Sequence, residues 1–428
     1  MAERKLVMLE FIKNKIIKGK APAMFRLPFV YSLGKAMVRC NLLKYSYRSA
    51  AMTAEYGLEQ IRKIFKGRSP HVWVSAFFPT ELLHALDIVS LSPEVISALV
   101  TSLGFQNNFL EEAESRWWSR DNCSFHRCAM GGLFSNFYPV PAAFCTSSHL
   151  CEGGVFMFNN LARHYNRPFI LLDTPLDNNG NALLYVIRQL QKITTLLERV
   201  AGTRLRTEKL EEAVLNTEKT RRAMLKVNEL RRHPDSPLRS REAFAYLYLY
   251  FTGMGSRAVT GIYETLAAEL EKKIKESQNS KGGETSPRYR LLWLHLQPFY
   301  ENGIMDYLEA NGAELIFEDF SHVYWESGDA GRPLEYIACR MLSHFNYGRI
   351  DRRIKTILEL ARRYKVDGVI HFSHWGCRQS NGSINIIRKS LLEEGLPFLV
   401  LDGDCIDNRN YASGQVQTRI NGFLEMLS

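Results

Sequence analysis

The feature that most constrains the fold is an alternation of short apolar runs with helical patterns, which occurs in two blocks of the chain. The strand-like runs of the first block are residues 71–76, 142–146 and 168–173. Those of the second block are residues 290–296, 313–317, 368–372 and 397–401. Strands that alternate with helices form parallel sheets covered by helices. The sequence therefore predicts an α/β fold with two Rossmann-like parallel-sheet lobes joined by a helical segment.

A charge-rich helical stretch separates the two blocks. Residues 205–215 place apolar side chains at helical spacing with charged side chains between them, which is typical of a surface helix. Residues 276–287 are rich in Ser, Gly and polar side chains and indicate a linker. We therefore expect four parts: an N-terminal helical segment (1–66), a first α/β lobe with Cys123 and Cys151 (67–200), a helical connection and linker (201–287), and a second α/β lobe with Cys377 (288–428).

Composition and charge exclude several classes of protein. The 428 residues are 46% hydrophobic, which is enough for a full core. No apolar run approaches a membrane span, and the first twenty residues lack the apolar block of a signal peptide, so we expect a cytoplasmic protein with no membrane contact. The net charge of +10 attracts anions such as CoA phosphates or an acidic partner. Its basic residues are interspersed with acidic and apolar ones along helices, so we expect no nucleic-acid partner.

The eight cysteines carry the strongest chemical signal. Thiols stay reduced in the cytosol, so these residues are either buried or bound to metal. Cys123, Cys151 and Cys377 each precede a predicted helix, where free backbone N–H groups stabilise a thiolate or a cluster sulfide. The chain has no Cys-x-x-Cys pair for zinc and no ferredoxin-type run. Burial explains any one of these cysteines, whereas the set of three, drawn from both lobes, indicates one shared cleft.

Several ordered motifs also resemble those of a known family. They are FPTELLHA at 78–85, CSFHRCAMG at 123–131, SHLC at 148–151, LARHYNRP at 161–168, HWGCR at 374–378 and LDGD at 401–404. Together with residues 407–427, they make most of the chain similar to the 2-hydroxyacyl-CoA dehydratase and benzoyl-CoA reductase subunit family, in particular to the 2-hydroxyglutaryl-CoA dehydratase D-component type.

The resemblance implies a [4Fe–4S] cluster bound by Cys123, Cys151 and Cys377, with the fourth iron open to water or substrate. It implies a lyase that removes water from a 2-hydroxyacyl-CoA through a ketyl radical. It also implies a dimer with a homologous second subunit or with a second copy of the chain, and a separate ATP-hydrolysing iron–sulfur activator that supplies the electron. The cluster carries the difficult chemistry, and the protein binds, orients and excludes water.

Two alternatives stay open at this point. The simplest family pattern has three cysteine ligands, and this chain has additional cysteines near them: Cys128, Cys145 and Cys339. Some members of the family hold an [8Fe–9S] double-cubane cluster on additional cysteines and reduce small molecules in an ATP-dependent reaction. The other alternative is a non-catalytic, cluster-bearing partner subunit that relays electrons. Cys40 is unremarkable, whereas Cys405 follows the Asp-Gly-Asp turn and could approach the site.

The candidate catalytic residues are Glu81 and Ser124, which we expect near the cleft as proton-transfer or hydroxyl-binding groups. The helix dipole offers a purely structural explanation for Glu81, because a carboxylate is favoured in the first turn.

Other polar residues have two interpretations each. His126, His371 and His374 either donate hydrogen bonds to a cluster sulfide or to the thioester, or are structural. Arg378 either binds a CoA phosphate or pairs with a carboxylate. A cluster of charged residues near the C-terminus is interpreted as a loop that stabilises the fold rather than as a metal site. It consists of Asp402, Asp404, Asp407 and Arg409.

Overall fold

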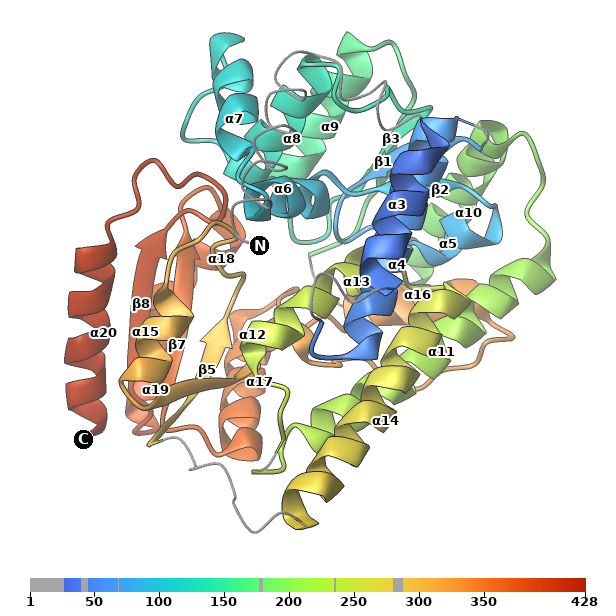
Figure 1. The fold of residues 1–428 in the computed structure, drawn as a ribbon. Helices are drawn as coiled ribbons and strands as arrows, with labels where there is room; N and C mark the ends of the chain where they lie inside the picture. Colours follow the sequence, from blue (N-terminus) through green and yellow to red (C-terminus); the bar gives the residue numbers. More distant parts are fainter. Residues whose placement is uncertain (1–26, 40–44, 68, 177–179, 235, 280–287) are drawn as a thin grey trace.

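The computed structural model describes residues 27–39, 45–67, 69–176, 180–234, 236–279 and 288–428 (Figure 1). Its first sheet is parallel, has the order β2-β1-β3-β4, and consists of β1 (His71–Val74), β2 (Val89–Leu91), β3 (Ala143–Ser147) and β4 (Phe169–Leu172). The second sheet is parallel, has the order β6-β5-β7-β8, and consists of β5 (Tyr289–Leu294), β6 (Ala313–Glu318), β7 (Gly368–His374) and β8 (Phe398–Gly403). The predicted α/β class with two parallel-sheet lobes is confirmed.

Apolar runs explain why these segments form central strands. Every residue of β1, β3 and β7 is buried, as expected for strands with helices on both faces of the sheet. The helices of the first lobe are α5 (Glu81–Ala85), α6 (Pro93–Ser102), α7 (Gln106–Ser115), α8 (Ser124–Phe134) and α9 (Glu152–His164). Those of the second lobe are α15 (Ile304–Ala310), α16 (Pro333–Leu342), α17 (Ile350–Tyr364), α18 (Arg378–Asn381), α19 (Ile384–Glu393) and α20 (Ser413–Leu427).

The remaining helices support the first lobe and connect it to the second. They are α3 (Pro28–Arg39), α4 (Arg48–Lys66), α10 (Ala182–Ala201), α11 (Thr207–Leu230), α12 (Ser240–Ala243), α13 (Leu247–Thr252) and α14 (Arg257–Asn279). The long helices α11 and α14 pack side by side (Figure 1). As expected for a helical connection, the described residues between 201 and 279 contain no strand.

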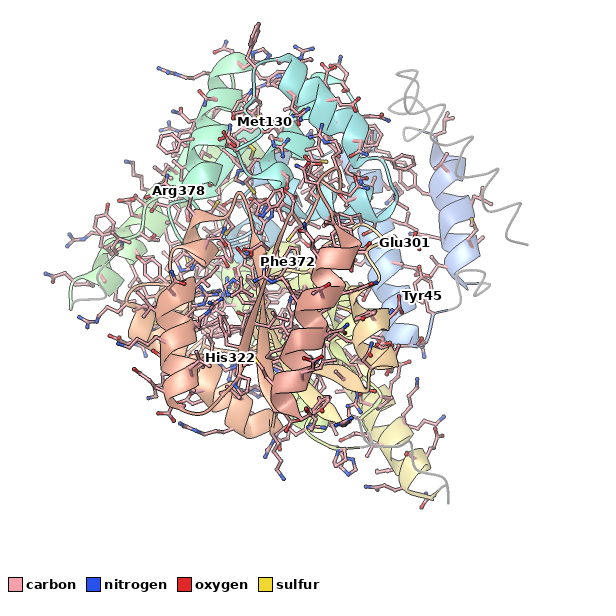
Figure 2. The ribbon with its side chains drawn as sticks, turned by 90° about the vertical axis from the view of Figure 1, so that its left-hand side faces the viewer. Tyr45, Met130, Glu301, His322, Phe372 and Arg378 are labelled. Carbon is pink, nitrogen blue, oxygen red and sulfur yellow. The ribbon has the colours of Figure 1, made fainter. Side chains whose placement is uncertain are left out.

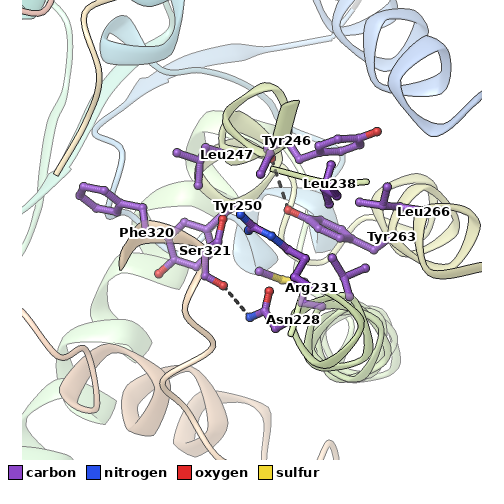
Figure 3. A pocket seen from close by; sticks show the side chains of 13 residues that line it. Asn228, Arg231, Leu238, Tyr246, Leu247, Tyr250, Tyr263, Leu266, Phe320 and Ser321 are labelled. Carbon is purple, nitrogen blue, oxygen red and sulfur yellow. Dashed lines mark hydrogen bonds between the residues drawn. The ribbon is translucent and has the colours of Figure 1, made fainter. Parts of the chain in front are cut away.

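A buried ion pair fastens this connection to the second lobe. Arg231, which follows α11, donates to both oxygens of Glu318 at 2.7 and 2.8 Å, and both side chains are almost fully buried. Beside Arg231 lies a small cavity between α11, α14 and the second lobe (Figure 3). Asn228 donates to the carbonyl of Ser321 across it at 2.8 Å. Cys123, Cys151 and Cys377, the three predicted ligands, do not line this cavity.

The structure differs from the predicted elements in four places. Strand β2 was not predicted, because three residues carry too little pattern. Between the runs at 290–296 and 313–317 the sequence predicts a helix from Tyr300 to Ala310. The structure shows that α15 begins at Ile304, because Gly303 adopts a left-handed φ of 70° before it. A helix was expected near Asn381, whereas α18 already begins at Arg378. Finally, α16 leaves its own sheet and packs against α10 and α11 (Figure 1).

Some predictions fall outside the described residues, namely the amphipathic segment before residue 27, Cys40 and most of the linker at 276–287. Within the described residues, no helix combines the length and apolarity that crossing a bilayer requires.

Candidate metal centre

Each of the three predicted ligands occupies the residue immediately before a helix. Cys123 is the N-cap of α8, Cys151 of α9 and Cys377 of α18. The Sγ atom of Cys151 accepts the backbone N–H of Gly154 at 3.4 Å. Unpaired N–H groups at a helix start stabilise negative charge, so these positions suit sulfur that is bound to a metal.

The two lobes meet at these cysteines. Gly376, in the second lobe, lies so close to Cys123 that a Cβ at this position would be 2.3 Å from the Cα of Cys123. Burial, followed by the negative charge of Cys151 and Cys377, raises the pKa of the Cys123 thiol well above its usual value. Burial and the charge of Cys151 also raise the pKa of Cys377, to about 11. These electrostatic effects indicate that the three thiols lie near one another, and a bound positive metal would offset the repulsion between their thiolates.

Two buried histidines contact the sulfur atoms. The Nε2 atom of His374, at the end of β7, lies 3.5 Å from the Sγ of Cys123. His126 lies between Cys151 and Glu94, and its Nε2 is 3.7 Å from a Glu94 oxygen. Burial lowers the pKa of His126, but hydrogen bonds to Cys151 and Glu94 outweigh burial and raise the pKa to about 10. Both histidines contact predicted ligands, and their donation to a cluster sulfide stays a prediction.

Ser124 fixes the loop that follows β8. Its hydroxyl donates to Oδ1 of Asp404 at 2.5 Å, and both residues are buried. The same oxygen accepts the backbone N–H groups of Ile406 and Asp407 at 2.7 and 2.8 Å. Ser124 thus lies beside the Cys123 ligand, with its proton already engaged in a contact between the lobes.

An ion-pair network reinforces the same junction. Arg127 of α8, 2% exposed, lies 2.5 Å from Glu114 and 3.3 Å from Asp407. Arg409 binds both of these carboxylates from the second lobe. The loop that carries Asp407 and Arg409 therefore clamps the two lobes together, in agreement with its predicted structural role. No pattern in the sequence indicates that Glu114 and Arg127 are the partners of this loop.

The additional cysteines lie elsewhere. Cys128 and Cys145 are fully buried in the apolar core of the first lobe, within α8 and β3. Cys339 is exposed on α16. Cys405 is buried beside the site, and its backbone N–H donates to Nδ1 of His374 at 3.2 Å. The structure therefore groups Cys405 with the three predicted ligands, but it does not group Cys145 or Cys339 with them.

Glu81 is fully buried in an ion pair. Arg340 of α16 donates to its two oxygens at 2.8 and 2.9 Å, and the Thr217 hydroxyl donates at 3.1 Å. These contacts hold α16 against the first lobe and explain why this helix leaves its own sheet. A catalytic role for Glu81 stays a prediction, and it would require the carboxylate to leave Arg340.

The other predicted polar residues have ordinary partners. His371 is hydrogen-bonded to Ser380 at 2.9 Å and not to a sulfur atom. Arg378, 91% exposed, points to solvent near Glu152 at 3.9 Å (Figure 2). Asp402 pairs with Arg419 at 2.9 Å on the surface. Arg378 is thus free to swing toward a ligand phosphate, since an exposed pair at this distance adds little stability.

The chemistry of the donor set fits a cluster better than a single ion. Among the described residues, no group of three or more His, Cys, Asp or Glu side chains converges tightly enough to hold one metal ion. A cubane cluster spreads its cysteine ligands more widely and is stabilised by N–H donors to sulfur. Cys123, Cys151 and Cys377 provide such a set at three helix starts, with His374 and His126 as neighbours.

The fold and site define a class of protein: a two-lobed α/β protein in which three thiols meet at the junction of the lobes. A family model described as 2-hydroxyglutaryl-CoA dehydratase, D-component, matches residues 75–427. The chain belongs to this family, which confirms the predicted resemblance and the predicted enzyme class, a lyase of the dehydratase type.

Curated relatives are similar over nearly the whole chain. The (R)-2-hydroxyisocaproyl-CoA dehydratase alpha subunit of Clostridioides difficile is 25% identical over 383 residues, which cover 86% of this chain and 93% of the relative. The (R)-phenyllactyl-CoA dehydratase alpha subunit of Clostridium sporogenes is 21% identical, with coverage of 83% and 89%. The lactoyl-CoA dehydratase subunit alpha of Anaerotignum propionicum is 20% identical, with coverage of 83% and 90%.

Proposed function

We propose that this chain is the iron–sulfur subunit of an enzyme that eliminates water from a 2-hydroxyacyl-CoA, with a [4Fe–4S] cluster bound by Cys123, Cys151 and Cys377. The observation that carries the proposal is the close approach of the Cys377 loop to Cys123 at Gly376, together with the electrostatic influence of Cys151 and Cys377 on the Cys123 thiol. The substrate class rests on relatives whose names specify dehydratases of 2-hydroxyisocaproyl-, phenyllactyl- and lactoyl-CoA.

When bound, the cluster would supply one low-potential electron to the thioester carbonyl. The hydroxyl group would then leave as hydroxide and a β-hydrogen as a proton, and return of the electron to the cluster would complete the elimination of water. The residues of this chain hold and insulate that site. Three helix starts provide N–H groups for the sulfur atoms, and the Arg127 network keeps the two lobes closed around them. Exclusion of water protects a radical from side reactions.

The positions of the additional cysteines support four iron atoms rather than eight. Cys145 lies in the middle of the fully buried strand β3, and Cys339 is exposed on a helix that packs against α10 and α11. The main causes of the raised pKa of Cys123 include the charges of Cys151 and Cys377, and those of Cys377 include the charge of Cys151. A double-cubane cluster would need thiols from such positions to reach the same site.

Partners follow from the family and the names of its members. The curated relatives are alpha subunits, which supports a heterodimer with a homologous second subunit. We propose a separate ATP-hydrolysing iron–sulfur activator as the electron donor, because a low-potential electron needs an external source of energy. The cytoplasmic location predicted from the sequence is part of this proposal.

The test begins with anaerobic reconstitution and a count of iron and sulfide. We expect about four of each per chain, Cys377→Ser to lose most of the iron, and the matched control Cys339→Ser to retain it. A folded wild-type chain that binds no iron would overturn the proposal. Turnover is then measured with the activator, ATP, a reductant and a panel of 2-hydroxyacyl-CoA esters. A bound cluster without turnover on any ester would favour an electron-relaying partner subunit instead.

A further inference from the structure

A histidine of the second lobe is aimed at a cysteine of the first. His374 is 1% exposed, and its Nε2 lies 3.5 Å from the Sγ of Cys123, within the range of a hydrogen bond to sulfur. The two residues are 251 positions apart in the chain, so this contact exists only when the lobes are joined.

The opposite side of the ring determines which nitrogen carries the proton. The backbone N–H of Cys405 points at Nδ1 of His374 at 3.2 Å, so Nδ1 must be an acceptor. The carboxylate of Asp404 lies 3.9 Å from Nδ1, which is too far for an Nδ1–H group to donate a hydrogen bond to it. This carboxylate already accepts a hydrogen bond from the Ser124 hydroxyl. The neutral ring therefore carries its proton on Nε2, which faces the sulfur of Cys123.

The surrounding chain holds this donor in place. His374 pairs with Gly403 in the β7–β8 register, and its carbonyl accepts the Asn381 amide at 2.7 Å. The ring of Phe125 meets the imidazole edge to face at 5.3 Å, and the His295 ring stacks at 6.3 Å. The imidazole is therefore preorganised. Its Nε2–H group needs little further free energy to be oriented when the Cys123 sulfur becomes negatively charged.

We propose that His374 is a positioning residue for the cluster: it donates its Nε2–H to the Cys123 thiolate and thereby raises the reduction potential of the bound iron. The proposal rests on the cluster-binding function proposed above. A hydrogen bond to a ligand sulfur stabilises the more negative, reduced state more than the oxidised state.

The experiment compares His374→Phe, which has no donor, with His374→Gln, whose amide N–H can replace Nε2–H. The matched control is His71→Phe, because His71 is a buried histidine of the first lobe that bonds only the carbonyl of Pro139 at 3.3 Å. Each protein is reconstituted anaerobically, its iron is counted, and its midpoint potential is measured by EPR-monitored titration. Circular dichroism establishes that each variant is folded.

We expect His374→Phe to reduce the ratio of reduced to oxidised cluster about tenfold at a fixed potential, which corresponds to about 59 mV for a one-electron couple. His374→Gln should stay near the wild-type potential, and His71→Phe should match wild type. If His374→Phe folds but loses iron while His374→Gln retains iron and potential, the positioning role is also supported.

Two outcomes would overturn the inference. One is a midpoint potential in His374→Phe equal to that of the wild type, and the other is a Gln variant that behaves like the Phe variant. Failure of the wild-type chain to bind iron is a different result, because it refutes the proposed function before any variant is compared.

Discussion

The contact between Gly376 and Cys123 allows a quantitative prediction for Gly376→Ala. The new Cβ would lie 2.3 Å from the Cα, 2.7 Å from the backbone N and 3.1 Å from the Cβ of Cys123. Ordinary van der Waals contact begins at 3.4 Å, so the two lobes must separate here by about 1 Å. The closest atoms belong to the backbone and cannot rotate away as a flexible side chain would.

Gly376→Ala should reduce both the stability of the fold and the binding of iron. Overpacking of this type costs about 1–3 kcal/mol, so the free energy of unfolding of the apoprotein should fall by that amount. Metal sites tolerate ligand displacements of only about 0.2 Å, so a shift of about 1 Å between Cys377 and Cys123 should also abolish most iron binding. The assay is urea unfolding of the apoprotein, followed by iron analysis of the reconstituted, folded fraction.

Two other glycines serve as controls. Gly131→Ala would place a Cβ 1.7 Å from the carbonyl oxygen of Phe109 within the first lobe, so it should destabilise the fold while the folded fraction retains its iron. Gly422→Ala faces open space in α20 and should raise stability by up to about 1 kcal/mol. Gly376→Ala with normal iron content and normal stability would refute the reasoning.

Three further predictions concern the rest of the molecule. Arg340→Met leaves the carboxylate of Glu81 buried without its cation, so urea unfolding should show a loss of about 3–5 kcal/mol, and a loss below about 1 kcal/mol would contradict the ion pair. Burial raises the pKa of Asp319 to about 6, so between about pH 4 and 6 the unfolded chain loses this proton before the folded one. Stability should fall with rising pH in that window by about 3 kcal/mol relative to Asp319→Asn, and parallel pH profiles for the two proteins would exclude the shift. Cys145→Ala should cost about 1 kcal/mol for its buried cavity and retain all iron; a halved iron content would revive the double-cubane alternative.

Much of the fold was predictable because local pattern determines it. Seven strands follow from apolar runs, and three cysteines at helix starts follow from the residues that flank them. Strand β2 was missed because Val89–Leu91 relies on pairing with β1 rather than on its own sequence. For the same reason, the helical pattern of α16 revealed an apolar face but not its partner, which is set by the Arg340 and Glu81 pair, 259 residues apart.

Of the candidate site, the sequence predicted the three cysteines but not the contacts around them. The cysteines were recognisable as candidate ligands from their residue type alone. The donor role of His374, by contrast, depends on a contact with Cys123 and a second contact with Cys405. Gly376 stood within the predicted motif, yet its importance lies in the absence of a side chain against a distant backbone. Such pairings arise from tertiary structure, which single-sequence reasoning does not contain.

Because the candidate site combines residues of two lobes, it is completed only late in the synthesis of the chain. More than half of the sequence separates Cys123 from Cys377. At typical rates of synthesis, a ribosome needs about 10–45 s to extend the chain from Cys151 to Cys377. During that interval two of the three ligands exist without the third. For the proposed cluster, iron delivery would therefore follow translation of the second lobe, and an interrupted chain would present two of the three proposed ligands as reduced thiols.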